Sequence, residues 1–175
     1  MAENINIRMA QQDDAEVVAS VLTEVSEGVI EHLLGGLLPG MSPAKILEMV
    51  LSRGSGNLDL KHVLLVEVDQ KLGGLLFAYD AREQTVSSVM EGFLGTRKVD
   101  ELRPLLEAKV DEALWINTFW VHEDFRGLGL AQMLMSLAED WGSGIPGSSV
   151  WHCTVGLIIF GPNGFMLLSI LNKRA

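Results

Sequence analysis

The chain has 175 residues, of which 48% are hydrophobic, and this is enough for one compact domain with a substantial core. Its 13 basic and 23 acidic side chains give a formal net charge of −10, which argues against a nucleic-acid partner and suits a neutral or cationic substrate. Cys153 is the only cysteine, so an internal disulfide is excluded and we expect no cysteine-based metal cluster.

The first third of the chain predicts a short strand followed by helices. Polar and apolar residues alternate over 4–9, as in a half-buried strand. Helical periodicity over 15–25 and 29–34 predicts two short helices or one broken helix, and Ser42-Pro43 predicts the start of a further helix that runs to about residue 51. No basic stretch leads into an apolar segment, and no apolar run approaches the roughly 20 residues of a membrane span. We therefore expect a cytoplasmic protein with no membrane partner.

The middle of the chain predicts an antiparallel hairpin and then a helical insertion. Two apolar runs, 62–68 and 72–79, flank a polar turn and read as paired strands. Residues 82–112 are rich in Glu, Lys, Leu and Val, with Gly92, Gly95 and Pro104 as expected interruptions. This range predicts two amphipathic helices that could form a lid.

A strand, a glycine-containing loop and a helix are expected in succession from residue 114 onward. Residues 114–121 are aromatic and β-branched, and apolar residues recur on one face of a helix from Leu130 to Trp141. Another strand is expected over 149–155. The last 20 residues are apolar and are interrupted by a Gly-Pro-Asn-Gly sequence.

The chemistry-bearing segment is the loop between this strand and its helix. A helix N-terminus has unpaired N–H groups and a partial positive charge, so it binds anions such as phosphate. Gly127 and Gly129 lack a Cβ, which lets a diphosphate approach the backbone closely. Glycine-rich turns also serve nucleotides or simply tighten loops, but the Rossmann and P-loop patterns are both missing here.

This segment resembles the acyl-CoA-binding signature of the GNAT superfamily of N-acetyltransferases, Gln/Arg-x-x-Gly-x-Gly/Ala. Arg126, Gly129 and Ala131 match it, with Gly127 as a frequent companion. The resemblance covers about residues 5–155 and is strongest over 114–141. It implies an α/β (α+β) fold with a mixed, mostly antiparallel central sheet flanked by helices. A single domain would span 1–175, with the helical insertion 82–112 between the third and fourth strands.

The resemblance also implies where acetyl-CoA binds as co-substrate, with no metal required. Backbone amides from Arg126 to Ala131 would hold the diphosphate, and the main chain around Phe119 and Val121 would pair with the pantetheine arm. The implied cofactor-binding residues are Phe119, Trp120, Val121, Arg126, Gly127, Leu128, Gly129, Leu130, Ala131 and Asn163.

Candidate catalytic and substrate residues come from the strands. Strand alternation would put Trp115, Asn117, Phe119 and Val121 on one face, and related enzymes often have Glu or His at the first two positions. Asn117 could hold water or the amine, or be structural. His152 is the titratable alternative.

Beside the hairpin, Asp80 could bind a cationic amine or be a turn residue, and Tyr79 next to it could contact substrate or pack. His122 and Glu123 are expected to have surface roles.

The C-terminus departs from the family pattern. Asn163 alone fits the expected Asn-x-x-Ala, with Met166 at the alanine position, and Ile170 stands where a tyrosine acid is usual. Too few residues then remain for a closing hairpin. The resulting sheet edge could be covered in a homodimer.

The sequence thus predicts an N-acetyltransferase that transfers acetyl from acetyl-CoA to a primary amine of a small molecule or peptide. The alternative is a non-catalytic acyl-CoA-binding homologue, either a sensor or a degenerate enzyme, because a strand base and the tyrosine acid are both missing.

Overall fold

The computed structural model describes residues 4–54, 56–107, 112–146, 151–161 and 164–173. They divide into two compact units. The sheet unit comprises Met1–Met9, His62–Arg82 and Lys109–Ala175, and the helical unit comprises Ala10–Lys61 and Glu83–Ala108. The expectation of a single domain remains a prediction, and each unit is described by itself.

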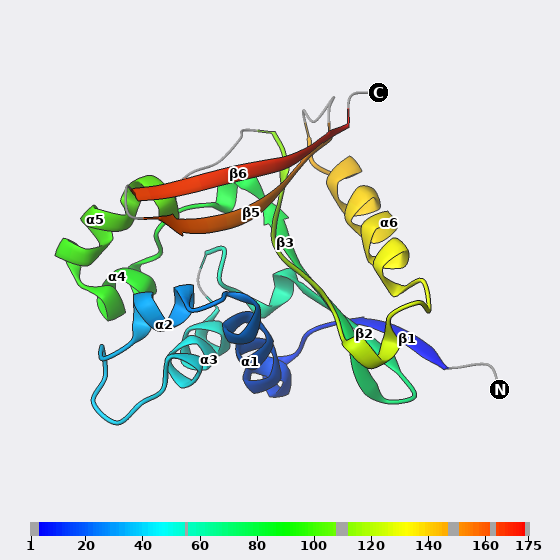
Figure 1. The fold of residues 1–175 in the computed structure, drawn as a ribbon, viewed down its shortest axis with the longest axis horizontal. Coiled ribbons are helices and arrows are strands. Elements are labelled where there is room, and N and C mark those ends of the chain that lie inside the picture. The colour runs from blue at the N-terminus through cyan, green and yellow to red at the C-terminus, as the bar shows by residue number, and fades with distance from the viewer. Residues whose placement is uncertain (1–3, 55, 108–111, 147–150, 162–163, 174–175) are drawn as a thin grey trace. The chain divides into compact units, whose positions relative to one another are not determined.

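In its described residues, the sheet unit contains six strands in sequential order and one long helix (Figure 1). The strands are β1 (Ile5–Met9), β2 (Val63–Val68), β3 (Lys71–Asp80), β4 (Leu114–Val121), β5 (Trp151–Gly161) and β6 (Gly164–Lys173), and the helix is α6 (Leu130–Ser143). Strands β1 to β4 pair antiparallel, β5 is parallel to β4, and β6 is antiparallel to β5. The predicted mixed, mostly antiparallel sheet is therefore confirmed.

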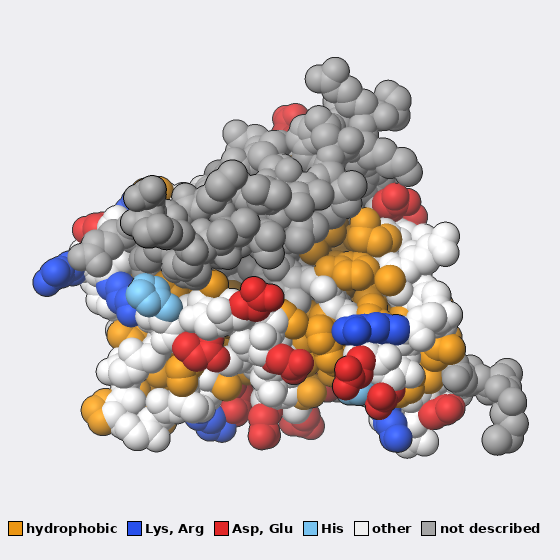
Figure 2. All heavy atoms as spheres, viewed as in Figure 1, with side chains coloured by type: hydrophobic (Ala, Val, Ile, Leu, Met, Phe, Trp, Pro, Cys, Tyr) orange, Lys and Arg blue, Asp and Glu red, His pale blue; other side chains and the backbone are white. Residues whose placement is uncertain are grey.

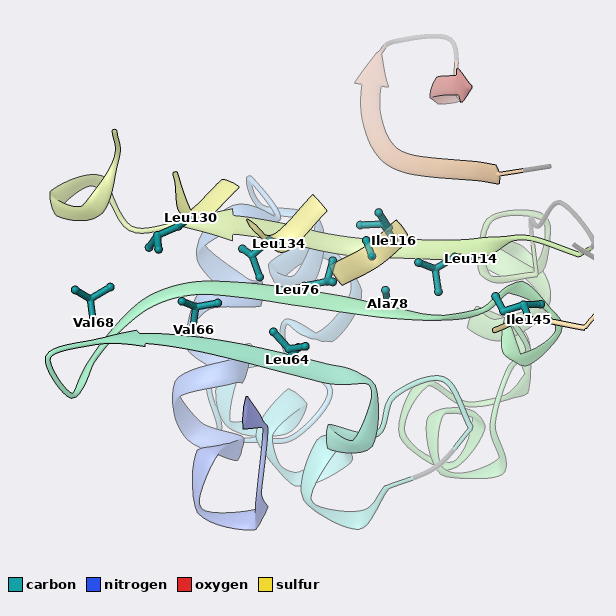
Figure 3. Close-up of a cluster of buried hydrophobic side chains, with 11 residues drawn as sticks. Leu64, Val66, Val68, Leu76, Ala78, Leu114, Ile116, Leu130, Leu134 and Ile145 are labelled. Carbon is teal, nitrogen blue, oxygen red and sulfur yellow. The ribbon is translucent and has the colours of Figure 1, made fainter. Parts of the chain in front are cut away.

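One face of this sheet is closed by α6, because β2, β3 and β4 direct apolar side chains toward it. Figure 3 shows Val66, Leu76 and Ile116 from these strands meeting Leu130 and Leu134 from the helix. Leu134 is fully buried at 0% exposure. Burying a side chain of this kind stabilises the fold by about 1.5–3 kcal/mol. This packing fixes the start of α6 against the sheet.

The helical unit contains the predicted helices α1 (Ala15–Val25), α2 (Val29–Leu34) and α3 (Pro43–Arg53), together with α4 (Ser88–Leu94) and α5 (Thr96–Leu106). Ser42 caps α3 by accepting from the Lys45 amide at 3.2 Å, with Pro43 in the first turn as expected. The Lys98 ammonium donates to the Leu33 carbonyl at 2.7 Å and so joins α5 to the C-terminus of α2.

The helical insertion between the third and fourth strands is confirmed. Two of the three residues that were expected to interrupt its helices, however, lie inside them. Gly95 ends α4 with a positive φ of 75°. Gly92, by contrast, lies inside α4, and Pro104 lies inside the last turns of α5. A proline there removes one N–H donor near the helix end, which a largely exposed helix tolerates better than its centre would.

After β5 the described residues contain one further strand, β6, rather than a separate closing hairpin. Strand β5 runs to Gly161, beyond the predicted end at 155, and β6 pairs with it from Phe160↔Phe165 back to Trp151↔Lys173. Two apolar runs on either side of a Gly-Pro-Asn-Gly sequence are a hairpin signal, and pairing satisfies their backbone groups. β6 therefore covers the edge of β5, and the homodimer remains a prediction.

Candidate functional site

The candidate site lies where β4 leads into α6 within the sheet unit. After Val121 the chain makes a single 3₁₀ turn, η4 (Glu123–Phe125), and then an extended residue at Arg126. Gly127 and Gly129 both have positive φ, 87° and 81°, and α6 begins at Leu130. The predicted strand, glycine loop and helix are therefore all present.

The hydrogen bonds of the loop decide which amides can bind a ligand. The Arg126 amide donates to the Glu123 carbonyl at 3.2 Å, and the Leu128 amide donates to the Phe125 carbonyl at 3.4 Å. The first helical bond runs from the Met133 amide to the Gly129 carbonyl at 3.0 Å. Among the described residues, five amides of this segment donate to no protein acceptor, namely those of Gly127, Gly129, Leu130, Ala131 and Gln132.

The two loop glycines leave space beside these amides. A Cβ built on Gly127 or Gly129 would meet no heavy atom within 4 Å. Both residues are exposed, and their left-handed backbone is one that side-chain-bearing residues rarely adopt. The segment is therefore an open cradle of N–H groups at the positive end of a 14-residue helix.

Strand β4 contains a β-bulge at Asn117. Ala78 of β3 pairs with Ile116, and Phe77 pairs with Thr118, so Asn117 has no partner on β3. A bulge reverses the alternation of side chains along a strand. The expectation that Trp115, Asn117, Phe119 and Val121 share one face is therefore wrong.

The burial pattern agrees with the reversal. Leu114 and Ile116 before the bulge belong to the core under α6, and Phe119 and Val121 after it pack against the same core. Trp115 pairs with Tyr79 of β3, whose side chain is not part of that core. Trp115 thus lies on the opposite face and is buried at 6% exposure.

Strands β4 and β5 separate at this bulge. Their register pairs are Trp115↔Thr154 and Ile116↔Val155. From Asn117 to Val121, the described part of β5 offers no register partner, although it continues to Gly161. This half of β4 therefore has main-chain groups available on the side away from β3.

Asn117 is exposed at the point where the two strands part. Its Oδ1 accepts a hydrogen bond from the Thr118 hydroxyl at 3.0 Å, which leaves the two amide N–H donors of Asn117 available. The side chain can therefore hold a water or a carbonyl oxygen, but it cannot act as a strong base.

The last three residues of β4, 119–121, are half-buried. Phe119 and Val121 direct their side chains into the core, so their main chain is the part that a ligand can reach. Trp120 lies on the other face, where its ring meets the edge of His122 with centroids 5.6 Å apart.

Tyr79 and Asp80 stand at the end of β3 in different environments. Tyr79 is buried at 1% exposure and packs edge-on against Phe77. Asp80 is 18% exposed, and both of its carboxylate oxygens lie 2.9 Å from the Nε of Arg82. A cationic substrate would have to replace this guanidinium to reach the carboxylate.

The two other predicted residues are His152 and Asn163. His152 lies in β5, in register with Asn172 of β6. Asn163 lies outside the described residues.

In the described part of the chain, no cluster of three or more His, Cys, Asp or Glu side chains could hold a metal ion, and no helix is long and apolar enough to span a membrane.

Two residues were missed by the sequence reasoning. The Gln132 amide belongs to the cradle because Gly129 is the N-cap, and the first three helical residues, 130–132, lack intrahelical acceptors. If Gly129 is taken as the N-cap, the sequence alone identifies the Gln132 amide as free. Arg82 was missed as the partner of Asp80, although its spacing of two residues after a strand end is typical of a local turn pair.

Comparisons with known proteins agree with this geometry. An N-acetyltransferase from Staphylococcus aureus Mu50 is 21% identical, with 87% of this chain and 82% of that chain covered and a TM-score of 0.64. A second acetyltransferase structure is 17% identical, with 87% and 81% covered and a TM-score of 0.61. Both likenesses show the fold. A comparison with curated protein sequences finds no match.

The family itself follows from a sequence model. The model of the acetyltransferase (GNAT) family matches residues 62–156, more than half of the chain. The match includes β2 to β4, the loop with its free amides, and α6. This chain therefore belongs to the GNAT acetyltransferase family.

Proposed function

We propose that this chain is an N-acetyltransferase that transfers the acetyl group of acetyl-CoA to a primary amine of a small molecule or peptide. The observation that carries the proposal is the cradle of free amides at Gly127 and Gly129–Gln132. Several N–H donors at a helix N-terminus, beside glycines with no atom near their missing Cβ, suit a diphosphate.

The charge of the loop supports an anionic ligand in spite of the acidic chain. The net charge is −10, and acidic side chains lie at several places on the face drawn in Figure 2. The helix dipole and the exposed Arg126 supply positive charge locally. The side chain of Arg126 is exposed, so its guanidinium can reach a bound phosphate.

The free half of β4 suits the pantetheine arm of CoA. An extended ligand with amide groups can add to an unpaired strand edge through main-chain hydrogen bonds. The main chain from Asn117 to Val121 has such an edge, and it runs toward the amide cradle. The thioester end would then lie near Asn117, where β4 and β5 part, and the diphosphate near Gly129.

The reaction forms a bond from the amine nitrogen to the acetyl carbon and breaks the carbon–sulfur bond. The amine loses one proton, and the departing thiolate gains one. Asn117 would orient the amine or a water through its free N–H donors. A main-chain N–H near Phe119 would stabilise the negative charge that develops on the carbonyl oxygen. His152 is the proposed proton acceptor.

A cationic acceptor fits the surface charge. Tyr79 and Asp80 end the strand next to β4, and we propose that this corner contacts the amine substrate. Asp80 would do so by exchanging Arg82 for the ammonium group, since its carboxylate is already paired.

The second candidate is a non-catalytic acyl-CoA-binding homologue. The observation that favours it is that β4 offers Trp115 and Asn117 where a base is expected, while Asp80, at the end of the neighbouring strand, is held by Arg82. Neither a tryptophan nor an asparagine side chain can accept a proton at neutral pH.

Two measurements test the proposal. Calorimetry with CoA should show binding, and a thiol reagent should detect CoA released from acetyl-CoA in the presence of a panel of diamines, polyamines and short peptides. No CoA binding at millimolar concentration would refute both functions. Binding with no thiol release across the panel would favour the non-catalytic reading.

A further inference from the structure

His122 makes three hydrogen bonds at the start of the loop between β4 and α6. Its backbone N–H donates to the Gly73 carbonyl of β3 at 3.0 Å, and its carbonyl accepts from the Phe125 amide at 3.1 Å. Its ring Nδ1 accepts a third hydrogen bond, from the Asp124 amide at 3.2 Å. His122 thereby caps η4, the turn that precedes the amide cradle.

The ring of His122 is held in place by two aromatic neighbours. The Trp120 ring meets it edge-on at 89°, and the Phe125 ring is tilted against it at 54°, each with centroids 5.6 Å apart. Because these contacts position the ring, Nδ1 points at the Asp124 amide without further ordering. To accept this bond Nδ1 must carry no proton, so a neutral ring holds its proton on Nε2.

The cap at His122 affects the rest of the loop, because later residues of the loop donate hydrogen bonds back to earlier ones. Asp124 is tied to His122, the Arg126 amide then bonds back to Glu123, and the Leu128 amide bonds back to Phe125. These bonds turn the engaged amides inward and leave the others open. A ligand that needs preorganised donors loses affinity when the donors must first be ordered.

Building on the proposed function, we infer that His122 is a positioning residue for the diphosphate of CoA. Its Nδ1 holds the η4 turn and thereby sets the direction of the free amides at Gly127 and Gly129–Gln132. His122 itself touches neither the acetyl group nor the amine in this scheme. Its contribution is confined to the diphosphate end of the ligand.

Two variants separate the effect of the Nδ1 acceptor on CoA binding from the effect of the aromatic ring. His122→Phe keeps an aromatic ring between Trp120 and Phe125 but removes the acceptor. His122→Asn removes the ring contacts but retains a side-chain oxygen, and asparagine is among the best N-cap residues. Calorimetry gives the Kd of CoA for each variant, and competition against CoA gives the Kd of pantetheine, which has the thiol arm but no diphosphate.

We expect His122→Phe to weaken CoA binding roughly fivefold, the change that corresponds to loss of a typical N-cap. Pantetheine affinity should be unchanged, and His122→Asn should bind CoA within about twofold of the original protein. Thermal melting of each variant shows whether it is folded.

Each of the other possible results would refute either the proposed function or the inference about His122. If the unmodified protein does not bind CoA, the proposed function fails. If it binds and His122→Phe binds equally well, the inference about His122 fails while the function stands. Equal weakening of CoA and pantetheine, or His122→Asn as weak as His122→Phe, would likewise overturn it, because the effect would then be general or would come from the ring.

Discussion

Replacing Gly129 with valine tests the amide cradle most directly. Gly129 has a φ of 81° and no heavy atom within 4 Å of the position its Cβ would take. The side chain therefore fits sterically in the free protein, and the folding cost is the strain of a left-handed residue, about 1–2 kcal/mol. The added methyl groups would stand where a bound diphosphate approaches the N–H groups.

The expected loss of affinity follows from the hydrogen bonds that the side chain obstructs. A hydrogen bond from an amide to a charged group contributes about 1.5–3 kcal/mol, and 1.4 kcal/mol is a factor of ten in Kd. Obstructing one such bond at Gly129 predicts CoA binding weaker by roughly 10- to 100-fold.

Gly40 offers a matched control in the helical unit. Its φ is 76°, and a Cβ there would also meet no heavy atom within 4 Å. Gly40→Val should therefore lower the free energy of unfolding by a similar amount in guanidinium denaturation. Calorimetry should nevertheless give it the CoA affinity of the original protein. If Gly129→Val and Gly40→Val bind CoA equally well, the assignment of the diphosphate site is refuted.

Three further substitutions test the core, the acceptor side and the strand bulge. Leu134→Ala should lower the free energy of unfolding by about 2–5 kcal/mol in guanidinium denaturation, because Leu134 is fully buried under the sheet; a loss below about 1 kcal/mol would contradict that packing. Asp80→Asn should raise the KM of cationic acceptors roughly tenfold and leave the KM of acetyl-CoA unchanged. An unchanged amine KM would mean that Asp80 serves only to hold Arg82. Asn117→Ala should lower kcat roughly tenfold without changing the Kd of CoA, and an unchanged kcat would assign Asn117 a structural role.

The elements that carry the site were predictable because local sequence decides them. β4 has the predicted bounds, since aromatic and β-branched residues from Leu114 to Val121 favour a strand. α6 begins directly after Gly129, where a glycine with positive φ separates the extended loop from the helix. In both cases the residues that define the element lie within it or directly before it in the sequence.

The bulge at Asn117 was not predictable in the same way. It is defined by which residues of β3 pair with β4, namely Phe77 with Thr118 and Ala78 with Ile116. The sequence Ile-Asn-Thr is as compatible with a regular pleat as with a bulge, so alternation assigned Trp115 to the wrong face. The spacing of Asp80 and Arg82 is typical of a local turn pair, but their ion pair is established by the side-chain geometry.

The bulge also explains how one strand can serve both the core and a ligand. Before Asn117, β4 has pairing partners on both sides, and Trp115 and Ile116 are buried. After it, the reversed alternation returns Phe119 and Val121 to the core under α6, so the strand stays anchored although β5 has departed. A regular strand would have turned these two side chains away from α6 and lost that anchor. The bulge therefore keeps the free main-chain edge anchored to the core, as the proposed binding of an extended ligand requires.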